Sequence, residues 1–265
     1  MRLFSVVVLG VAATAIAACS DDDFTGPTKP PTAAVRLVNG MSSASAVDIR
    51  AVEQVEWTPT ANVLAYRHAT PYFPTEAKAM RLRVFQACQV AIPATCTPEA
   101  VSTVYLDTTI TFIADSRVTL LLTGTTTSAR FIMIGDDVTA PNSGDIGIRL
   151  VNASTGAIDG YVTAAAADPL PGTPTFTAAA GPGATSGYIS RPAGAATARI
   201  TAGGVPAPVL ATGVGASAPN PLPGTPQNPG AGVTSPGTKF SVYFFPQVGS
   251  TAATVLWLVD RNPAD

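Results

Sequence analysis

The chain has 265 residues, of which 46% are hydrophobic and 12% charged, and its formal net charge is -2. Soluble domains carry about 25% charged residues, so the chain is poor in charge and has no basic footprint for nucleic-acid binding. Its 23 glycines and 24 prolines favour short strands joined by turns over long helices, collagen or coiled coil.

The first residues have the features of an export signal. Arg2 precedes an apolar run at residues 4–18, which is shorter than the roughly 20 residues of a membrane-spanning helix. Small residues end the run, as they do before a secretory cleavage site. We therefore predict a signal peptide over residues 1–18.

The end of this segment, Ile16-Ala17-Ala18-Cys19, resembles the lipobox of bacterial lipoproteins. The resemblance implies that the Cys19 thiol takes a diacylglyceryl group and that its freed amine is also acylated, for example with palmitate. Two or three acyl chains anchor a protein stably in a membrane, whereas one chain binds reversibly. Cys19 is thus predicted to hold the mature chain in the cell envelope.

Residues 19–33 are predicted to be the acylated cysteine and a flexible tether, of which residues 24–33 form a stiffer polar spacer because clustered proline favours extended chain. Ser20 resembles the residue that directs lipoproteins to the outer membrane. The acidic run at residues 21–23 fits either a surface-export signal or a solvated tether. The expected location is the outer membrane, with the protein lipid-anchored on the periplasmic side or at the cell surface.

Two stretches of the chain match each other in order. The sequence VRLVN at 35–39 is repeated as IRLVN at 148–152. Further matches keep the same order: Asp48 with Asp159, residues 64–66 with 186–188, 117–120 with 239–242, and Asp136 with Asp260. We predict a first β-sandwich at 34–137, a linker at 138–145, and a second β-sandwich at 146–265 with long Gly/Pro loops.

The expected elements are mostly strands. β-branched, roughly alternating segments at 35–39, 101–113, 117–123 and 130–134 recur in the second half at 146–151, 198–201, 240–245 and 254–259. Residues 75–80 are predicted to form one helical turn. The fold class is all-β, with two tandem antiparallel, immunoglobulin-like β-sandwiches packed from face-to-face sheets.

The pattern at 148–162, together with Gly187-Tyr188-Ile189 and Pro192-Ala193-Gly194, is similar to the family called domain of unknown function 4397. Two successive copies of the family pattern together cover residues 34–265, and the second copy resembles the pattern more closely. The first copy departs from the pattern at Gly40-Met41. Members of the family are mostly secreted or envelope proteins, so the resemblance implies a fold and a location but no active site.

Cys88 and Cys96 remain as an even pair in a chain expected to be exported. A disulfide between them would contribute about 2–3 kcal/mol in the loop-entropy model. The rival interpretation is a metal-binding pair, but no second cysteine pair or nearby histidine completes a zinc site. The disulfide is the favoured prediction.

No residue pattern predicts catalysis. His68 is the sole histidine, and it is expected to be a packed or surface residue. Asp48 and Asp159 fall in separate copies, so a structural role is favoured over the paired carboxylates of a glycosidase. Calcium held near the joint by residues 136, 137 and 145 stays an open alternative. We expect neither a cofactor nor a metal.

A duplicated PLPGTP sequence at 169–174 and 221–226 marks two loops that either pack side by side or are tolerated inserts. The predicted function is non-enzymatic. It is binding or scaffolding, with a matrix or glycan contact or an envelope protein as partner. The alternatives are a carboxylate-dependent hydrolase at the domain joint and a passive structural module.

Overall fold

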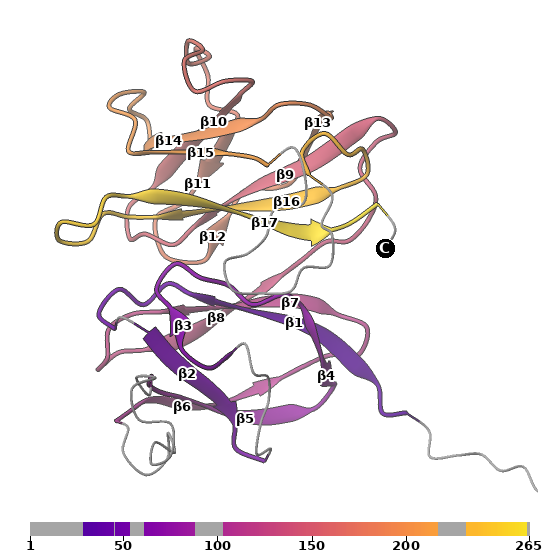
Figure 1. The fold of residues 1–265 in the computed structure, drawn as a ribbon, viewed down its shortest axis with the longest axis vertical. Helices are drawn as coiled ribbons and strands as arrows, with labels where there is room; N and C mark the ends of the chain where they lie inside the picture. Colours follow the sequence, from indigo (N-terminus) through magenta and orange to yellow (C-terminus); the bar gives the residue numbers. More distant parts are fainter. Residues whose placement is uncertain (1–28, 45, 54–60, 88–102, 217–231, 264–265) are drawn as a thin grey trace, which may run out of the picture. The chain divides into compact units, whose positions relative to one another are not determined.

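The computed structural model describes residues 29–263 except 45, 54–60, 88–102 and 217–231. Every regular element of this described part is a β-strand (Figure 1), which confirms the all-β class. Pro31–Asp265 forms one compact unit. The part of the chain that the structure describes contains no helix that could span a membrane.

The first half forms two sheets that enclose a hydrophobic core. One sheet has the order β4 (Phe73–Glu76), β1 (Thr32–Asn39), β7 (Arg117–Thr123), β8 (Arg130–Gly135). The other has the order β3 (Leu64–Ala65), β2 (Ala46–Ala51), β5 (Ala79–Gln86), β6 (Val104–Thr111). In β5, Met80, Leu82 and Val84 enter the core, and the alternate Arg81 and Arg83 point outward, as the period of two requires.

The second half also forms two sheets around its own core. One has the order β12 (Ala184–Thr185), β9 (Asp145–Asn152), β16 (Lys239–Phe245), β17 (Thr254–Arg261), and β13 (Ile189–Pro192) also pairs with β9. The other has the order β11 (Phe176–Ala178), β10 (Ile158–Thr163), β14 (Thr197–Ala202), β15 (Ala211–Val214). The strand orders of the two halves therefore correspond.

The sheets are not purely antiparallel as the sequence predicted. β1 pairs in parallel with β7, and β9 pairs in parallel with β16. A parallel pair needs a long crossover between its strands. The opposite sheet of each sandwich supplies that crossover, so no helix is needed.

The helical turn predicted at residues 75–80 is wrong. This stretch contains the end of β4, a short turn and the start of β5. Thr75 is buried and pairs with Ala33 on β1, and the Ala77 N–H donates to the carbonyl oxygen of Pro31. Sheet pairing with the start of the domain outweighs the weak local helix propensity.

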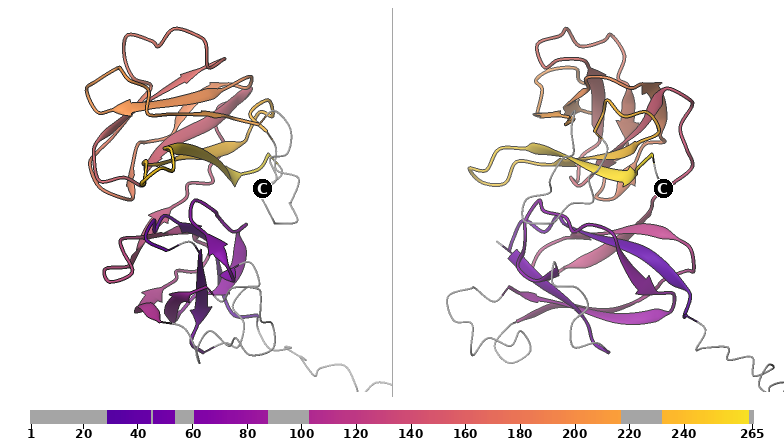
Figure 2. Two further views of the ribbon diagram at one scale, coloured as in Figure 1. Left: turned by 60° about the vertical axis from the view of Figure 1, so that its left-hand side comes forward. Right: turned by 45° about the vertical axis from the view of Figure 1, so that its right-hand side comes forward.

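The two sandwiches pack against each other through the β1 sheet and the β9 sheet (Figures 1 and 2). Val38, Leu121 and Ile134 from the first half form a hydrophobic cluster with Tyr243 and Leu258 from the second. The central strands β7 and β16 are buried on both faces. Their continuous apolar runs are typical of strands with a layer on each side.

Candidate functional site

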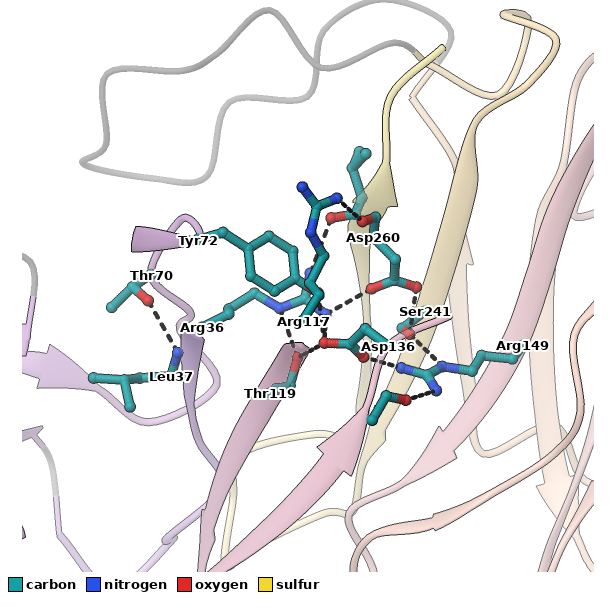
Figure 3. A network of polar contacts seen from close by, with 12 residues as sticks. Arg36, Leu37, Thr70, Tyr72, Arg117, Thr119, Asp136, Arg149, Ser241 and Asp260 are labelled. Atoms are coloured by element: carbon teal, nitrogen blue, oxygen red, sulfur yellow. Dashed lines mark hydrogen bonds and ion pairs between the residues drawn. The ribbon is translucent and has the colours of Figure 1, made fainter. Parts of the chain in front are cut away.

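A cluster of polar side chains is buried where the two sandwiches meet (Figure 3). Each sandwich contributes one arginine, one aspartate, one tyrosine and one hydroxyl residue. We call this set the joint cluster: Arg36, Tyr72, Thr119 and Asp136 from the first half, and Arg149, Tyr188, Ser241 and Asp260 from the second.

Arg36 lies on β1, and its side chain reaches into the second sandwich. Its Nε donates to Thr119 Oγ1 at 3.0 Å on the neighbouring strand. Its Nη2 donates to Asp260 Oδ1 at 2.6 Å, and its Nη1 donates to the Val259 carbonyl oxygen at 3.0 Å. The arginine therefore ties its own sheet to the last strand of the other sandwich.

Arg149 makes the reciprocal set of contacts from β9. Its Nε donates to Ser241 Oγ at 2.7 Å, and its Nη1 donates to the Gly135 carbonyl oxygen at 2.8 Å. Its Nη2 pairs with Asp136 Oδ1 of the first sandwich. Each sandwich thus supplies the arginine that neutralises the aspartate of the other.

The second oxygen of each aspartate is also satisfied. Asp136 Oδ2 accepts hydrogen bonds from Thr119 Oγ1 at 2.7 Å and from Tyr72 OH at 2.6 Å. Asp260 Oδ2 accepts them from Ser241 Oγ at 2.6 Å and Tyr188 OH at 2.8 Å. The two tyrosine rings also lie against the guanidinium groups, Tyr72 at 4.5 Å from Arg36 and Tyr188 at 4.7 Å from Arg149.

The charged and hydroxyl side chains of the joint cluster are almost completely removed from solvent, and its two tyrosines are half-buried. The Asp136 and Asp260 side chains are 0% exposed, and those of Arg36 and Arg149 are 2% and 5% exposed. Burial raises the pKa of Asp136, against the lowering effect of Arg36. Burial likewise raises the pKa of Tyr72 and of Tyr188. A carboxyl group with a raised pKa, such as that of Asp136, could exchange a proton, but this side chain has no exposed surface.

A second corresponding pair of residues fixes the chain before each tyrosine. Thr70 Oγ1 accepts the Leu37 N–H at 3.0 Å, and Ser186 Oγ accepts the Leu150 N–H at 2.8 Å. The counterpart of Tyr188 is therefore Tyr72, and the match of residues 64–66 with 186–188 expected from the sequence is wrong. Two other sequence matches agree with the contacts. Asp136 and Asp260 each bind an arginine of the other sandwich. Residues 117–120 and 239–242 lie on β7 and β16, which pair in parallel with β1 and β9.

An asparagine ends the first strand of each sandwich, Asn39 in β1 and Asn152 in β9. Asn39 Oδ1 accepts the Met41 N–H at 2.9 Å, and Asn152 Oδ1 accepts the Ser154 N–H at 2.8 Å. Each side-chain amide also donates to a backbone carbonyl oxygen, that of Asn39 to Leu64 on β3 and that of Asn152 to Ala179. These contacts hold the turn that follows each strand.

A DUF4397 domain is found at residues 33–161. The family's description is a domain of unknown function. The DUF4397 match covers the first sandwich from residue 33, β9 and the first four residues of β10, so it extends beyond the boundary predicted at residue 137. No curated protein matches the chain.

Within and beside the DUF4397 match, the other acidic candidates have structural contacts. Asp48 Oδ1 accepts the Val63 N–H at 2.6 Å, and Asp159 Oδ2 accepts the Gly204 N–H at 2.7 Å. Both carboxylates are buried and hold the loop that approaches their strand. The sequence interpretation of a structural role agrees with these contacts.

The aspartates considered for calcium do not share one site. Asp136 faces the two arginines, and Asp137 Oδ2 accepts a hydrogen bond from Lys239 Nζ at 2.6 Å. Asp145 begins β9. Among the residues that the structure describes, no group of three acidic, histidine or cysteine side chains could hold a metal ion.

The remaining sequence candidates lie partly outside the described residues. His68 is half-buried, and its Nδ1 lies 3.1 Å from the Tyr66 carbonyl oxygen. Cys19, Cys88, Cys96 and the PLPGTP copy at 221–226 are outside the described residues. The copy at 169–174 follows a loop that Arg199 holds through the Asp168 carbonyl oxygen at 2.6 Å.

The outward face of β5 gives a prediction on pH. Asp107 receives hydrogen bonds from Arg81 and Arg83, which lower its pKa to about 2. An unfolded aspartate has a pKa of about 3.9, so the contribution of this pair to stability is present above about pH 4 and is lost as the pH falls towards 2. The stability difference between wild type and Asp107→Asn, measured by urea unfolding, should therefore shrink over that interval. A carboxyl titration midpoint near 4 in the folded protein, measured by NMR, would contradict the prediction.

Proposed function

We propose that the chain is a non-enzymatic envelope lipoprotein in which two β-sandwiches act together as one binding or scaffolding element. The observation that supports this proposal is a reciprocal pair of contacts, in which the arginine of each sandwich binds the aspartate of the other. A buried ion pair adds little net stability compared with apolar packing, but it can specify one arrangement over others. The joint cluster suits a protein that must present its surfaces in a fixed relation.

The proposal treats the second half as a second copy of the DUF4397 domain. The corresponding strand orders support it, as do the paired residues of the joint cluster. In this interpretation the contact between the sandwiches descends from a symmetric, isologous contact, in which the same patch is used twice.

The hydrolase alternative places its carboxylates at the same joint. Asp136 and Asp260 do converge there, but their hydrogen bonds to arginine, tyrosine and hydroxyl groups occupy both oxygens of each. Their complete burial favours a structural use. A passive envelope module without a partner is the other alternative, and it would be favoured if the intact protein captures no partner from envelope extracts.

The anchor part of the proposal rests on the lipobox-like sequence ending at Cys19. The test is protease treatment of intact cells, with Cys19→Ala cells and lysed cells as controls. Degradation in intact cells supports surface display and a binding role outside the cell. Protection until lysis supports a periplasmic location. Mature protein that lacks lipid on Cys19 by mass spectrometry would overturn the anchor.

Cys88 and Cys96 give a further prediction. We expect purified, unreduced protein to resist thiol-reactive labelling at both positions, because a disulfide leaves no free thiol. After reduction both should be labelled, and the melting temperature should fall, since the loop-entropy model gives the bridge about 2–3 kcal/mol. Labelling of both residues before reduction would exclude the bridge, and mass spectrometry of the labelled peptides distinguishes the outcomes.

A further inference from the structure

A cavity of about 590 Å³ lies on the first sandwich, at the start of β1. It is lined by residues 32–34, 72–74 and 115–117, and by Val138 in the segment that follows β8. Ala33 and Val35 point into the core of the sandwich, so Thr32 and Ala34, which alternate with them, point to the other face of the sheet. Small-molecule sites have volumes of about 300–1,000 Å³, so the cavity is large enough for a small ligand.

The turn beside the cavity has a counterpart in the second sandwich. The Asp115 N–H donates to the Thr32 carbonyl oxygen at 2.9 Å, and the Gly237 N–H donates to that of Asp145 at 2.8 Å. Both turns have left-handed backbone, with φ of 60° at Asp115 and 88° at Gly237. The turns before β7 and β16 therefore correspond residue by residue.

A lysine side chain covers the counterpart of the cavity in the second sandwich. Lys239 lies across Gly147 on β9, where a Cβ would be 2.7 Å from the lysine Cγ. Its Nζ donates to Asp137 Oδ2 at 2.6 Å and to Thr139 Oγ1 at 3.1 Å. On β1 the position of Gly147 is taken by Ala34, which precedes VRLVN as Gly147 precedes IRLVN. The Cβ of Ala34 blocks the path that Lys239 takes, so the surface above β1 stays open.

Arg117 stands where Lys239 stands in the second sandwich, and its side chain takes another direction (Figure 3). Its Nη1 donates to the Asp260 carbonyl oxygen at 2.6 Å, and its guanidinium lies 4.9 Å from the centre of the Tyr72 ring. Arg117 is half-buried and lines the cavity. A ligand in the cavity can therefore contact its side chain.

The lining carries one charge of each sign. Asp115 is exposed and contributes a carboxylate, and Arg117 contributes the positive charge. Asp115 would repel an acidic ligand, and Arg117 would repel a basic one. Thr32 and Ser116 add hydroxyl groups, which can both donate and accept hydrogen bonds. These groups favour a neutral ligand that has many donors and acceptors.

The rest of the lining is apolar. Pro74 and Val138 are exposed there, and the ring of Tyr72 is half-buried. A sugar ring has hydroxyl groups along its edge and C–H groups on its faces, so it matches both parts of the lining. Building on the proposed binding function, we propose that this cavity binds a short segment of a neutral glycan. Asp115 and Arg117 bind the ring hydroxyls, and Pro74 packs against the C–H face of the sugar.

The test uses the full chain and titration calorimetry with four neutral trisaccharides: maltotriose, cellotriose, mannotriose and triacetylchitotriose. Trigalacturonate is the acidic probe, and the glucosamine trimer is the basic one. At least one neutral trisaccharide should bind wild type with a Kd below about 1 mM, and at least about tenfold more tightly than either charged probe. Backbone amide NMR signals of residues 32–34 and 115–117 in wild type should shift when it binds.

Two variants and a matched control locate the site. Asp115→Gly introduces the residue found at position 237 and removes the left-handed strain, so the fold should be kept while binding weakens at least about tenfold. Ala34→Leu fills the cavity from the face of β1 that points away from the core, and it should weaken binding as strongly. Asp107→Asn removes an exposed carboxylate on β6, outside the cavity, and should leave binding unchanged.

Three results would overturn the proposal: no neutral trisaccharide binds wild type, a charged probe binds as tightly as the neutral ones, or Asp115→Gly binds as wild type does. If Asp115→Gly lowers the melting temperature, Ala34→Leu gives the decision. If both variants are destabilised, the wild-type NMR signals decide, and unshifted signals at 32–34 and 115–117 count against the site. Capture of an envelope protein by a chain that binds no trisaccharide would remove the glycan site and leave the proposed function standing. Failure to bind either kind of partner would count against both.

Discussion

Replacing Asp136 by alanine is expected to lower the free energy of unfolding by about 3–5 kcal/mol, the usual cost of removing one partner from a buried ion pair. Arg149 would lose its carboxylate, and Thr119 and Tyr72 would lose the acceptor of their hydroxyl groups. Arg149 and Thr119 would stay buried, so water could not replace their missing contacts. Urea unfolding, with midpoint and slope fitted together, measures the effect.

Asp107→Ala is the matched control for this variant. Asp107 also binds two arginines, Arg81 and Arg83, but its side chain is 31% exposed and its partners are 48% and 30% exposed. Exposed ion pairs contribute little because water screens them, so this variant should lose only a small fraction of what Asp136→Ala loses. Equal effects of the two variants would show that the joint cluster does not hold the sandwiches together.

Strand identity was predictable from the sequence because it is a local property. The alternation in β5 and the apolar runs of β7 and β16 are visible along the chain. The match of Asp136 with Asp260 was found in the same way, since each lies two residues after an apolar run, at 131–134 and at 256–258. These features need no knowledge of contacts between distant segments.

The role of the arginines was not predictable in this way. A signal was present, because both VRLVN and IRLVN place one arginine in the middle of an apolar strand. Its meaning depends on a partner far along the chain, since Arg36 and Asp260 are separated by 224 positions. Only packing of the two sandwiches brings such residues together, so the sequence marks the position without giving the partner.

The tyrosine match failed for a related reason. The loops differ between the halves, and the sequence comparison paired Tyr188 with the first tyrosine that fitted, Tyr66. The structure pairs it with Tyr72, which donates to Asp136 as Tyr188 donates to Asp260. Where loop lengths differ, hydrogen-bond partners identify corresponding residues better than spacing does.

The contact at Gly183 gives the second large expected effect. Alanine there is strained by the left-handed backbone, at about 1–2 kcal/mol, and its Cβ would meet Ile132 Cγ2 at 2.5 Å. Isoleucine is branched at Cβ, so its side chain has few other rotamers to adopt. Overpacking should therefore cost about 1–3 kcal/mol more in free energy of unfolding. Gly183→Ala should therefore lower the free energy of unfolding, measured with urea, by the sum of the strain and overpacking costs.

Two further variants separate strain from clash. Gly181 also has left-handed backbone, with φ of 109°, but a Cβ there meets nothing within 4 Å. Gly181→Ala should therefore lower the free energy of unfolding by the strain cost alone. Ile132→Ala removes the atoms that the new Cβ would meet, so Gly183→Ala should cost less in that background than in wild type. Such coupling between the two substitutions is what a double-mutant cycle measures. Additive effects would mean that the sandwiches do not make this contact in solution.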